Sequence, residues 1–505
     1  MSAAAAPAVA PPPVAGKLDE FSDKLSPMLV KELRQGLRAK TFVILFLALQ
    51  GLLCVVLLSA IGASSDGDSG PAVSKVIFFF FSLAALVAQP LRGVSALHNE
   101  IKGNTIDLMV LTRLGAWRIV LGKWVAIVSQ TGLLLTAIAP YLILRYFFGR
   151  MELFAELLLL ALIFIGSAIF TALTVGLSAI SSILVRGLLP LGIAMWLGFG
   201  IMAIIFDNDL KDLIDFCTLQ DKEAGWALLA SLAICIYLGW MALAMGASMI
   251  APMAENHSTS RRLVAIGMVA LLGLIGWIAK IPREPMAVML MLVGVPAVTI
   301  ALTEPLQLLP PICRPFLKFG PLGKIAGRFL YPGWPSGVLF TGLLMASTIG
   351  VFFASPSAMR GIMTRLDTIG IVMLLVSLGT LLFPALFTRL FLRKARNPLG
   401  VYILIGVLLC VVAIGLAMIM EETRSDEYVW LFSWIPPVQL NVLAYLERGY
   451  YTSGASTPQS LDPVVVTGVV TTSLYFIGLL ICALRNFATI REVEQEAEGH
   501  INTPS

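Results

Sequence analysis

The chain has 505 residues, of which 58% are hydrophobic and only 13% are charged. Soluble domains carry about 25% charged residues, so this composition excludes a soluble globular protein and predicts an integral membrane protein. The formal net charge of +5 is small for the length and gives no indication of nucleic-acid binding.

The first 26 residues form an Ala- and Pro-rich leader that lacks the charged start and apolar core of a signal peptide, and we expect it to be disordered. The run PMLVKELRQGLRAK follows. It begins with Pro27 in a favoured first-turn position and spaces Leu29, Leu33 and Leu37 four residues apart. This pattern predicts an amphipathic helix on the membrane surface, which we call the leading helix.

Twelve apolar segments follow that approach the length of about 20 residues needed to cross a bilayer. The predicted fold is therefore all-α, a polytopic transmembrane helix bundle. The segments lie near residues 42–62, 72–91, 124–148, 153–180, 187–206, 226–250, 263–281, 286–302, 337–354, 368–390, 399–420 and 463–484.

The twelve spans divide naturally at the linker 251–262 into two sets of six. We predict two six-span domains, residues 27–250 and 263–484, followed by an acidic tail, 485–505, that is disordered beyond its first turns. The loop 303–336 occupies the same place in the second set as 91–123 in the first, and Ala301 to Glu304 faintly echoes Ala96 to Glu100. Its prolines exclude a continuous helix.

Lysine and arginine are distributed unevenly between the two sets of loops. With the N-terminus inside, 24 of the 35 fall on the inner side, and the positive-inside rule then places both termini, the linker and the loop 91–123 in the cytoplasm.

The stretch from Leu97 to Lys123 is the longest polar interruption in the first quarter of the chain. Gly103 can break a helix, and Asn104 can cap a new one with Asp107 three residues on. The short helix that follows is apolar nearly all round, so we expect the bundle to cover one side and a partner protein the other. A helix lying in the lipid interface is the alternative.

This stretch also carries a family resemblance. The run Glu100-x-x-x-x-Thr105-x-x-Leu108-x-x-Leu111-Thr112, followed by Ile119 to Lys123, resembles the segment between the second and third spans in permeases of type-2 (drug and polysaccharide exporter) ATP-binding-cassette exporters. Two departures are that Asn104 separates Gly103 from Thr105 and that Arg113 replaces the family's proline. The leading helix resembles the family's in its Lys31-Glu32-Leu33-Arg34 core, and the likeness spans residues 27–180.

The resemblance implies a permease subunit in the cytoplasmic (inner) membrane, driven by a separate cytoplasmic ATPase subunit. It leaves open the substrate, the direction of transport and whether a second permease chain completes the pathway. The implied ATPase-coupling residues are Glu100, Thr105, Asp107, Leu108, Leu111, Arg113 and Lys123, and those anchoring the leading helix are Lys31, Glu32 and Arg34.

No catalytic, cofactor or metal site is predicted on this chain. The phosphate-cradling pattern G-x-x-x-x-G-K-[ST] is absent, so ATP is expected on the partner. The three histidines are far apart, and no C-x-x-C pair occurs among the six cysteines. Four ionisable residues near span ends, Arg145, Glu152, Glu156 and Glu304, are expected to reach solvent at the membrane surface.

Two other classes remain open. A twelve-span secondary transporter would place a Gly-x-x-x-Asp-Arg-x-Gly-Arg pattern in its second loop, which this chain lacks. A membrane-embedded enzyme would need His, Asp or Glu clusters within its spans.

Overall fold

The computed structural model describes residues 27–63, 70–103, 115–146, 152–206, 209–219, 222–252, 255–356, 365–392, 397–423, 431–442 and 462–502. The leader 1–26 lies outside these ranges. Within them the chain is helical and contains no strand, which confirms the predicted all-α class. Among the described residues, twelve helical segments are long and apolar enough to cross a membrane, so this is the fold of a polytopic membrane protein.

The helices of the first six spans are preceded by the leading helix, α2 (Pro27–Arg38). The first span is α3 (Lys40–Ala63), and the third and fourth are α8 (Ala116–Tyr146) and α9 (Leu153–Leu177). The fifth span joins a π-helical turn, η4 (Leu184–Leu188), to α10 (Leu189–Phe206), and the sixth is α12 (Lys222–Ile250). An amphipathic helix that we did not predict, α11 (Asp209–Cys217), connects the fifth and sixth spans.

The second span is irregular. It runs through α4 (Gly70–Ser82), a π-helical turn η2 (Leu83–Ala88), α5 (Gln89–Leu91), a 3-10 turn η3 (Arg92–Ser95) and α6 (His98–Lys102). Backbone carbonyls in such a segment need partners inside the membrane, and α9 supplies them. The Ser167 hydroxyl donates to the Ala85 carbonyl at 2.6 Å and the Thr174 hydroxyl to the Pro90 carbonyl at 2.7 Å.

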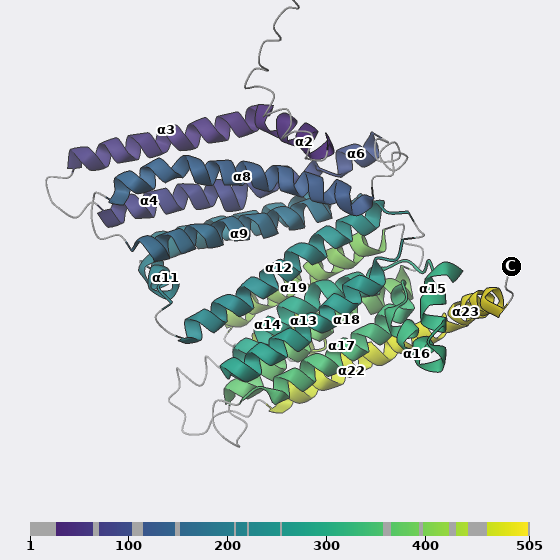
Figure 1. The fold of residues 1–505 in the computed structure, drawn as a ribbon. Coiled ribbons are helices and arrows are strands. Elements are labelled where there is room, and N and C mark those ends of the chain that lie inside the picture. The colour runs from purple at the N-terminus through teal and green to yellow at the C-terminus, as the bar shows by residue number, and fades with distance from the viewer. Residues whose placement is uncertain are drawn as a thin grey trace, which may run out of the picture.

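The last six spans are α13 (Ser258–Ala279), α14 (Arg283–Thr303), α17 (Trp334–Ala354), α18 (Arg365–Phe391), α19 (Pro398–Thr423) and α22 (Asp462–Leu484). Most begin a few residues before the predicted apolar segments, because a helix continues through the polar residues at the membrane surface. Figure 1 shows α6, α15, α16 and α23 at one end of the bundle, which we call the α6 end, and α11 at the other.

The two sets of six share a pattern of packing. In the first set the fourth span, α9, packs against the second span and against α12; in the second set the tenth span, α18, packs against α14 and α22. The third span contacts the sixth, and α17 contacts α22 in the same way. One difference is that the backbones of α8 and α9 lie close together, whereas those of α17 and α18 lie farther apart. This likeness supports the two-domain division, which stays a prediction.

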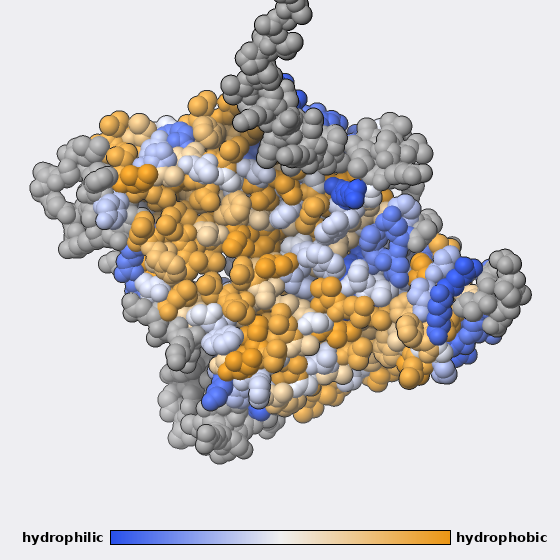
Figure 2. All heavy atoms as spheres, viewed as in Figure 1, coloured by the Kyte–Doolittle hydropathy of each residue, from blue (hydrophilic) through white to orange (hydrophobic). Residues whose placement is uncertain are grey.

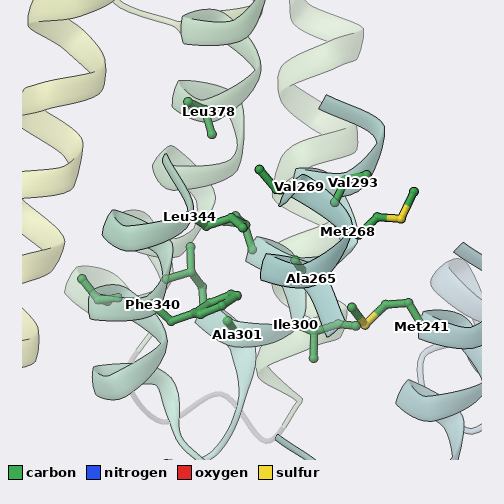
Figure 3. Close-up of a cluster of buried hydrophobic side chains, with 14 of the residues drawn as sticks. Met241, Ala265, Met268, Val269, Val293, Ile300, Ala301, Phe340, Leu344 and Leu378 are labelled. Carbon is green, nitrogen blue, oxygen red and sulfur yellow. The ribbon is translucent and has the colours of Figure 1, made fainter. Parts of the chain in front are cut away.

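One buried hydrophobic cluster joins the two sets. It brings α12 against α13 and α14, with Met241, Met268 and Val293 among its members (Figure 3). The Tyr237 hydroxyl donates to the Val293 carbonyl at 3.0 Å across the same contact. On the face shown in Figure 2, apolar side chains cover a broad area across the middle of the molecule, as expected of a surface that faces lipid.

Two segments at the α6 end were predicted without regular structure in detail. The proline-rich loop 303–336 has no continuous helix, as expected, but contains two short ones, α15 (Pro310–Leu317) and α16 (Gly320–Leu330), each with proline in its first turn. The expectation of a disordered tail was wrong as far as Asn502, because α23 (Phe487–Asn502) is helical. Its buried residues Phe487, Ile490 and Ala497 recur at helical spacing and pack in the core.

Candidate functional site

The candidate coupling stretch is described at both of its ends. Glu100 lies on α6, at the end of the second span, and Lys123 lies in α8, the third span. Residues 104–114 lie outside the described residues, and with them Thr105, Asp107, Leu108, Leu111 and Arg113. The structure therefore shows what holds the ends of the stretch, while the predicted contact residues within it remain predictions.

Lys123 connects three elements at the α6 end. Its ammonium lies 3.0 Å from a carboxylate oxygen of Glu32 on the leading helix and 3.1 Å from one of Glu100. The lysine side chain is only 7% exposed. Burying an ammonium is unfavourable unless opposite charges compensate it, and here two carboxylates do so. The leading helix, the second span and the third span are thus joined through one side chain.

Arg92 makes a second junction between the same elements. Its guanidinium donates to the Gln89 side chain at 2.8 Å, to the Gln130 side chain on α8, and to the Gly36 carbonyl on the leading helix at 3.5 Å. It also lies 5.7 Å from the centre of the Phe42 ring. The leading helix is therefore attached at two points, near its middle and near its C-terminal end. Lys31 and Arg34 are exposed on its surface.

The base of the stretch is fixed to the fourth span as well. The Leu97 amide donates to the Ser178 hydroxyl at 3.0 Å, just beyond the end of α9. Two residues earlier, Gly176 lets α9 and α12 approach closely, because a Cβ added there would lie 2.2 Å from the Ala242 carbonyl oxygen. The end of the second span is consequently held between α8, α9 and the leading helix.

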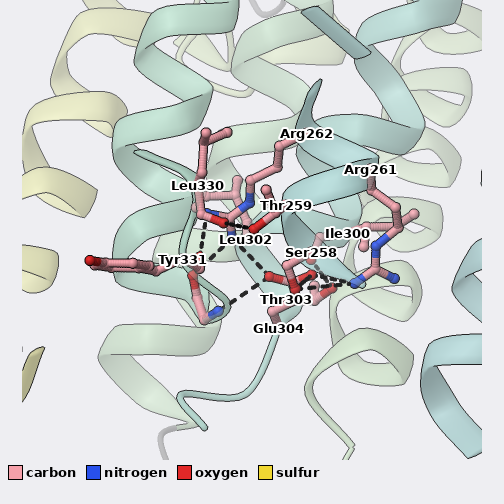
Figure 4. A network of polar contacts seen from close by, with 12 residues as sticks. Ser258, Thr259, Arg261, Arg262, Ile300, Leu302, Thr303, Glu304, Leu330 and Tyr331 are labelled. Atoms are coloured by element: carbon pink, nitrogen blue, oxygen red, sulfur yellow. Dashed lines mark hydrogen bonds and ion pairs between the residues drawn. The ribbon is translucent and has the colours of Figure 1, made fainter. Parts of the chain in front are cut away.

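A second polar cluster lies at the α6 end, around Glu304 (Figure 4). One carboxylate oxygen is 2.5 Å from the Arg261 guanidinium and accepts from the Ser258 hydroxyl at 2.8 Å. The other is 2.8 Å from the Arg262 guanidinium and accepts from the Gly333 amide at 3.2 Å. Glu304 is only 10% exposed, so the expectation that it reaches solvent was wrong. The two arginines lie near the start of α13, and their positive charges compensate the cost of burying the Glu304 carboxylate.

Arg262 extends this cluster to the start of α17. It donates to the carbonyls of Phe329 at 2.9 Å and Tyr331 at 2.6 Å, and to that of Gly333 at 3.1 Å. Gly333 has a φ of 112°, a conformation that glycine adopts without strain. The seventh, eighth and ninth spans are joined here as the leading helix, second and third spans are joined at Lys123.

The charge state of Glu304 follows from this environment. Burial on its own would raise the pKa of the carboxyl group, but Arg262 and Arg261, with hydrogen bonds from Ser258 and Gly333, more than offset it. The net result is a pKa below the ordinary value. Glu304 is therefore ionised at neutral pH and acts as a fixed negative charge between two arginines.

Glu100 and Glu304 hold corresponding positions. Each follows a similar Ala-Leu sequence at the end of the second span of its set, and each is bound to a cation. In the first set the cation comes from the third span and a second carboxylate from the leading helix. In the second set two cations come from the first span of the set. The faint sequence echo thus coincides with a shared structural role, although the partners differ.

A cavity of about 570 Å³ opens beside Glu304, between the two sets of spans. Its walls are the ends of α12 and α14, the starts of α13 and α19, the segment before η4, and parts of the loop 303–336. His257 and Glu255 form a pair at 2.9 Å, and the Asn397 amide donates to the Ser181 hydroxyl across the boundary between the sets. Within the described residues no group of His, Cys, Asp and Glu could hold a metal ion.

Comparisons with protein-family models, curated proteins and solved structures found no match. The family resemblance therefore rests on the motif residues alone.

Sequence reasoning selected Glu100, Lys123 and Glu32 but did not predict that they contact one another. It missed the Glu304 cluster and the cavity. Glu156, also expected to reach solvent, is buried in the first turn of α9. A usable signal for the Glu304 cluster was the adjacent pair Arg261-Arg262 inside an otherwise apolar helix, because charges within a span are rarely unpaired.

Proposed function

We propose that this chain is the membrane permease subunit of an ATP-binding-cassette exporter, driven by a separate cytoplasmic ATPase subunit. It would reside in the cytoplasmic (inner) membrane with both termini in the cytoplasm. The observation that supports this most is the junction at Lys123. It joins both ends of the stretch that resembles the family's coupling segment to the leading helix.

This junction provides a route for mechanical coupling. A partner that moves residues 104–114 acts on Glu100 at one end and on α8 at the other. Because Lys123 binds Glu100 and Glu32 together, a displacement of the second span is passed to the leading helix and to the third span. Packed helices with few alternative arrangements pass such shifts on as rigid elements.

The structure changes the role that we assign to Glu100. Its carboxylate is engaged by Lys123, so in the proposed mechanism Glu100 is an anchor. The direct contacts to the ATPase are assigned to Asp107 and Arg113 as polar residues and to Leu108 and Leu111 as apolar ones. These assignments follow from the resemblance.

The test is capture of the ATPase by tagged full-length chain purified in mild detergent from its native cells. Loss of a buried, hydrogen-bonded charge pair costs about 2–5 kcal/mol of binding, whereas a change in a solvated loop costs within about 0.5 kcal/mol. We expect Asp107→Ala with Arg113→Ala to lose copurifying ATP hydrolysis. Glu498→Ala, which removes a half-exposed ion pair at the same end of the bundle, should retain it.

Equal copurifying ATP hydrolysis in both variants and the wild type would show that residues 97–123 do not bind an ATPase. Uptake driven by an ion gradient, with the purified chain alone in vesicles, would instead favour the secondary transporter.

A further inference from the structure

The polar cavity beside Glu304 is followed, farther along the same seam between the spans, by an apolar groove. This groove has a volume of about 420 Å³ and lies between the fifth span (η4 and α10) and the eleventh (α19). Its walls are Leu184, Leu188, Ile193 and Trp196 on one side and Ile403 and Val407 on the other. Leu188 and Trp196 are exposed, so the groove opens towards the surrounding lipid.

The cavity and the groove lie along one seam between the two sets of spans. Ser181 lines the cavity and Leu184 the groove, and on the other side Gly400 lines the cavity and Ile403 the groove. Gly400 and Ile403 lie on α19, where three residues advance the helix by about 4.5 Å, so one site ends where the other begins. At the junction a Cβ on Gly400 would lie 3.5 Å from that of Ser182.

The two sites differ sharply in chemistry. The cavity is lined by the side chains of Ser181, His257, Gln307 and Asn397, and its arginine, Arg261, is already paired with Glu304. The groove is lined only by apolar residues and glycine. Ligand sites commonly have volumes of about 300–1,000 Å³, and each of these falls within that range. A polar site at the membrane surface in line with an apolar site at membrane depth matches a molecule with a headgroup and a hydrocarbon chain.

We infer that the seam binds a phospholipid from the leaflet at the α6 end, with its headgroup in the polar cavity and an acyl chain in the groove between α10 and α19. The binding depends on this chain alone and does not require an ATPase. Within the described cavity walls the arginine, Arg261, is already paired with Glu304, so a purely anionic headgroup meets no unpaired arginine there, which favours a zwitterionic headgroup.

Two glycines on α10 provide a matched test. A Cβ added to Gly192 or to Gly200 would meet no atom within 4 Å, so both positions have room for a larger side chain. Gly192 lines the groove and Gly200 does not. The side chain of Gly192→Trp would therefore occupy the groove, while Gly200→Trp would place the same side chain elsewhere on the helix.

The probe is a phosphatidylcholine that carries a photoreactive diazirine on one acyl chain, added to the purified full-length chain in detergent. Adducts are mapped by mass spectrometry. We expect labelling of α10 and α19 around the groove that unlabelled phosphatidylcholine displaces. Displacing two methylene groups from the groove corresponds to about tenfold weaker binding, so labelling should fall at least about tenfold in Gly192→Trp and persist in Gly200→Trp.

Labelling that no competitor displaces and that is equal in the two variants would mean annular lipid only, and would overturn the proposal. Diacylglycerol, which has the chains but no phosphate headgroup, should compete at least about tenfold less well than phosphatidylcholine. Equal competition would overturn the role of the polar cavity. Because no ATPase is present, a negative result in the lipid-labelling experiment does not affect the proposed permease function. A negative result in the ATPase-capture experiment likewise does not affect the proposed lipid site.

Discussion

Removing the carboxylate of Glu304 should destabilise the protein far more than removing an exposed carboxylate at the same end of the bundle. In Glu304→Ala, Arg261 and Arg262 stay buried, with side chains 6% and 3% exposed, but lose their common anion. Breaking a buried ion pair by deleting one partner costs about 3–5 kcal/mol. The arginines keep hydrogen bonds to Ser248 and to three backbone carbonyls, so we expect the lower end of that range.

Glu498→Ala is the matched control. Glu498 pairs with Lys324 at 2.5 Å, but the two side chains are 37% and 38% exposed, and such surface pairs contribute at most about 1 kcal/mol. The assay is thermal unfolding of detergent-solubilised full-length protein, followed by the loss of monodisperse protein on heating. Glu304→Ala should unfold several degrees below the wild type and Glu498→Ala within about a degree of it. Equal midpoints for the two variants would show that the Glu304 cluster contributes no more than a surface pair.

Three further predictions follow from the charges at the α6 end and from the topology. Because the pKa of Glu304 is lowered from 4.5, its contribution should be complete above that pH and fade as the pH falls below it. The difference in unfolding temperature between wild type and Glu304→Gln should therefore shrink in acid, and a constant difference would contradict the assigned ionisation. Lys123→Met should lower the unfolding free energy by about 2–3 kcal/mol and expose the leading helix to protease, because it removes the cation that Glu32 and Glu100 share. Lys324→Met, the control, should change the unfolding free energy and the protease sensitivity much less. A reporter fused after Ser505 should be cytoplasmic, and an external reporter would refute the topology.

The twelve spans could be predicted because hydropathy is a local property of the sequence, and any stretch of about 20 apolar residues is sufficient to indicate one. The helix α23 was missed because its acidic residues dominated the reading of the tail. Its apolar residues at helical spacing, Phe487, Ile490, Val493 and Ala497, contained the opposite signal. Those residues pack against the core, and Arg328 binds Glu494 at 3.1 Å, so tertiary contacts hold a helix that its charges alone would not.

The polar junctions could not be predicted, because their members are distant in sequence. Lys123 and Glu32 are 91 residues apart, and Glu304 lies 42 residues from Arg262. A periodic pattern identifies the face of a helix but does not state which distant charge lies opposite. Counting Arg261 and Arg262 as loop charges added two residues to the positive-inside count but hid the fact that both are buried.

The most direct test of the permease proposal is to identify, by photocrosslinking, what the stretch between Glu100 and Lys123 contacts. A photocrosslinking amino acid is placed at Leu108 in the full-length chain in its native membrane, and at the lipid-exposed Trp277 as a control. If the account is correct, the crosslinker at Leu108 captures a soluble protein that contains the phosphate-cradling pattern G-x-x-x-x-G-K-[ST], and the one at Trp277 captures lipid. Lipid adducts alone at both positions would contradict it and identify the stretch as a helix of the membrane interface.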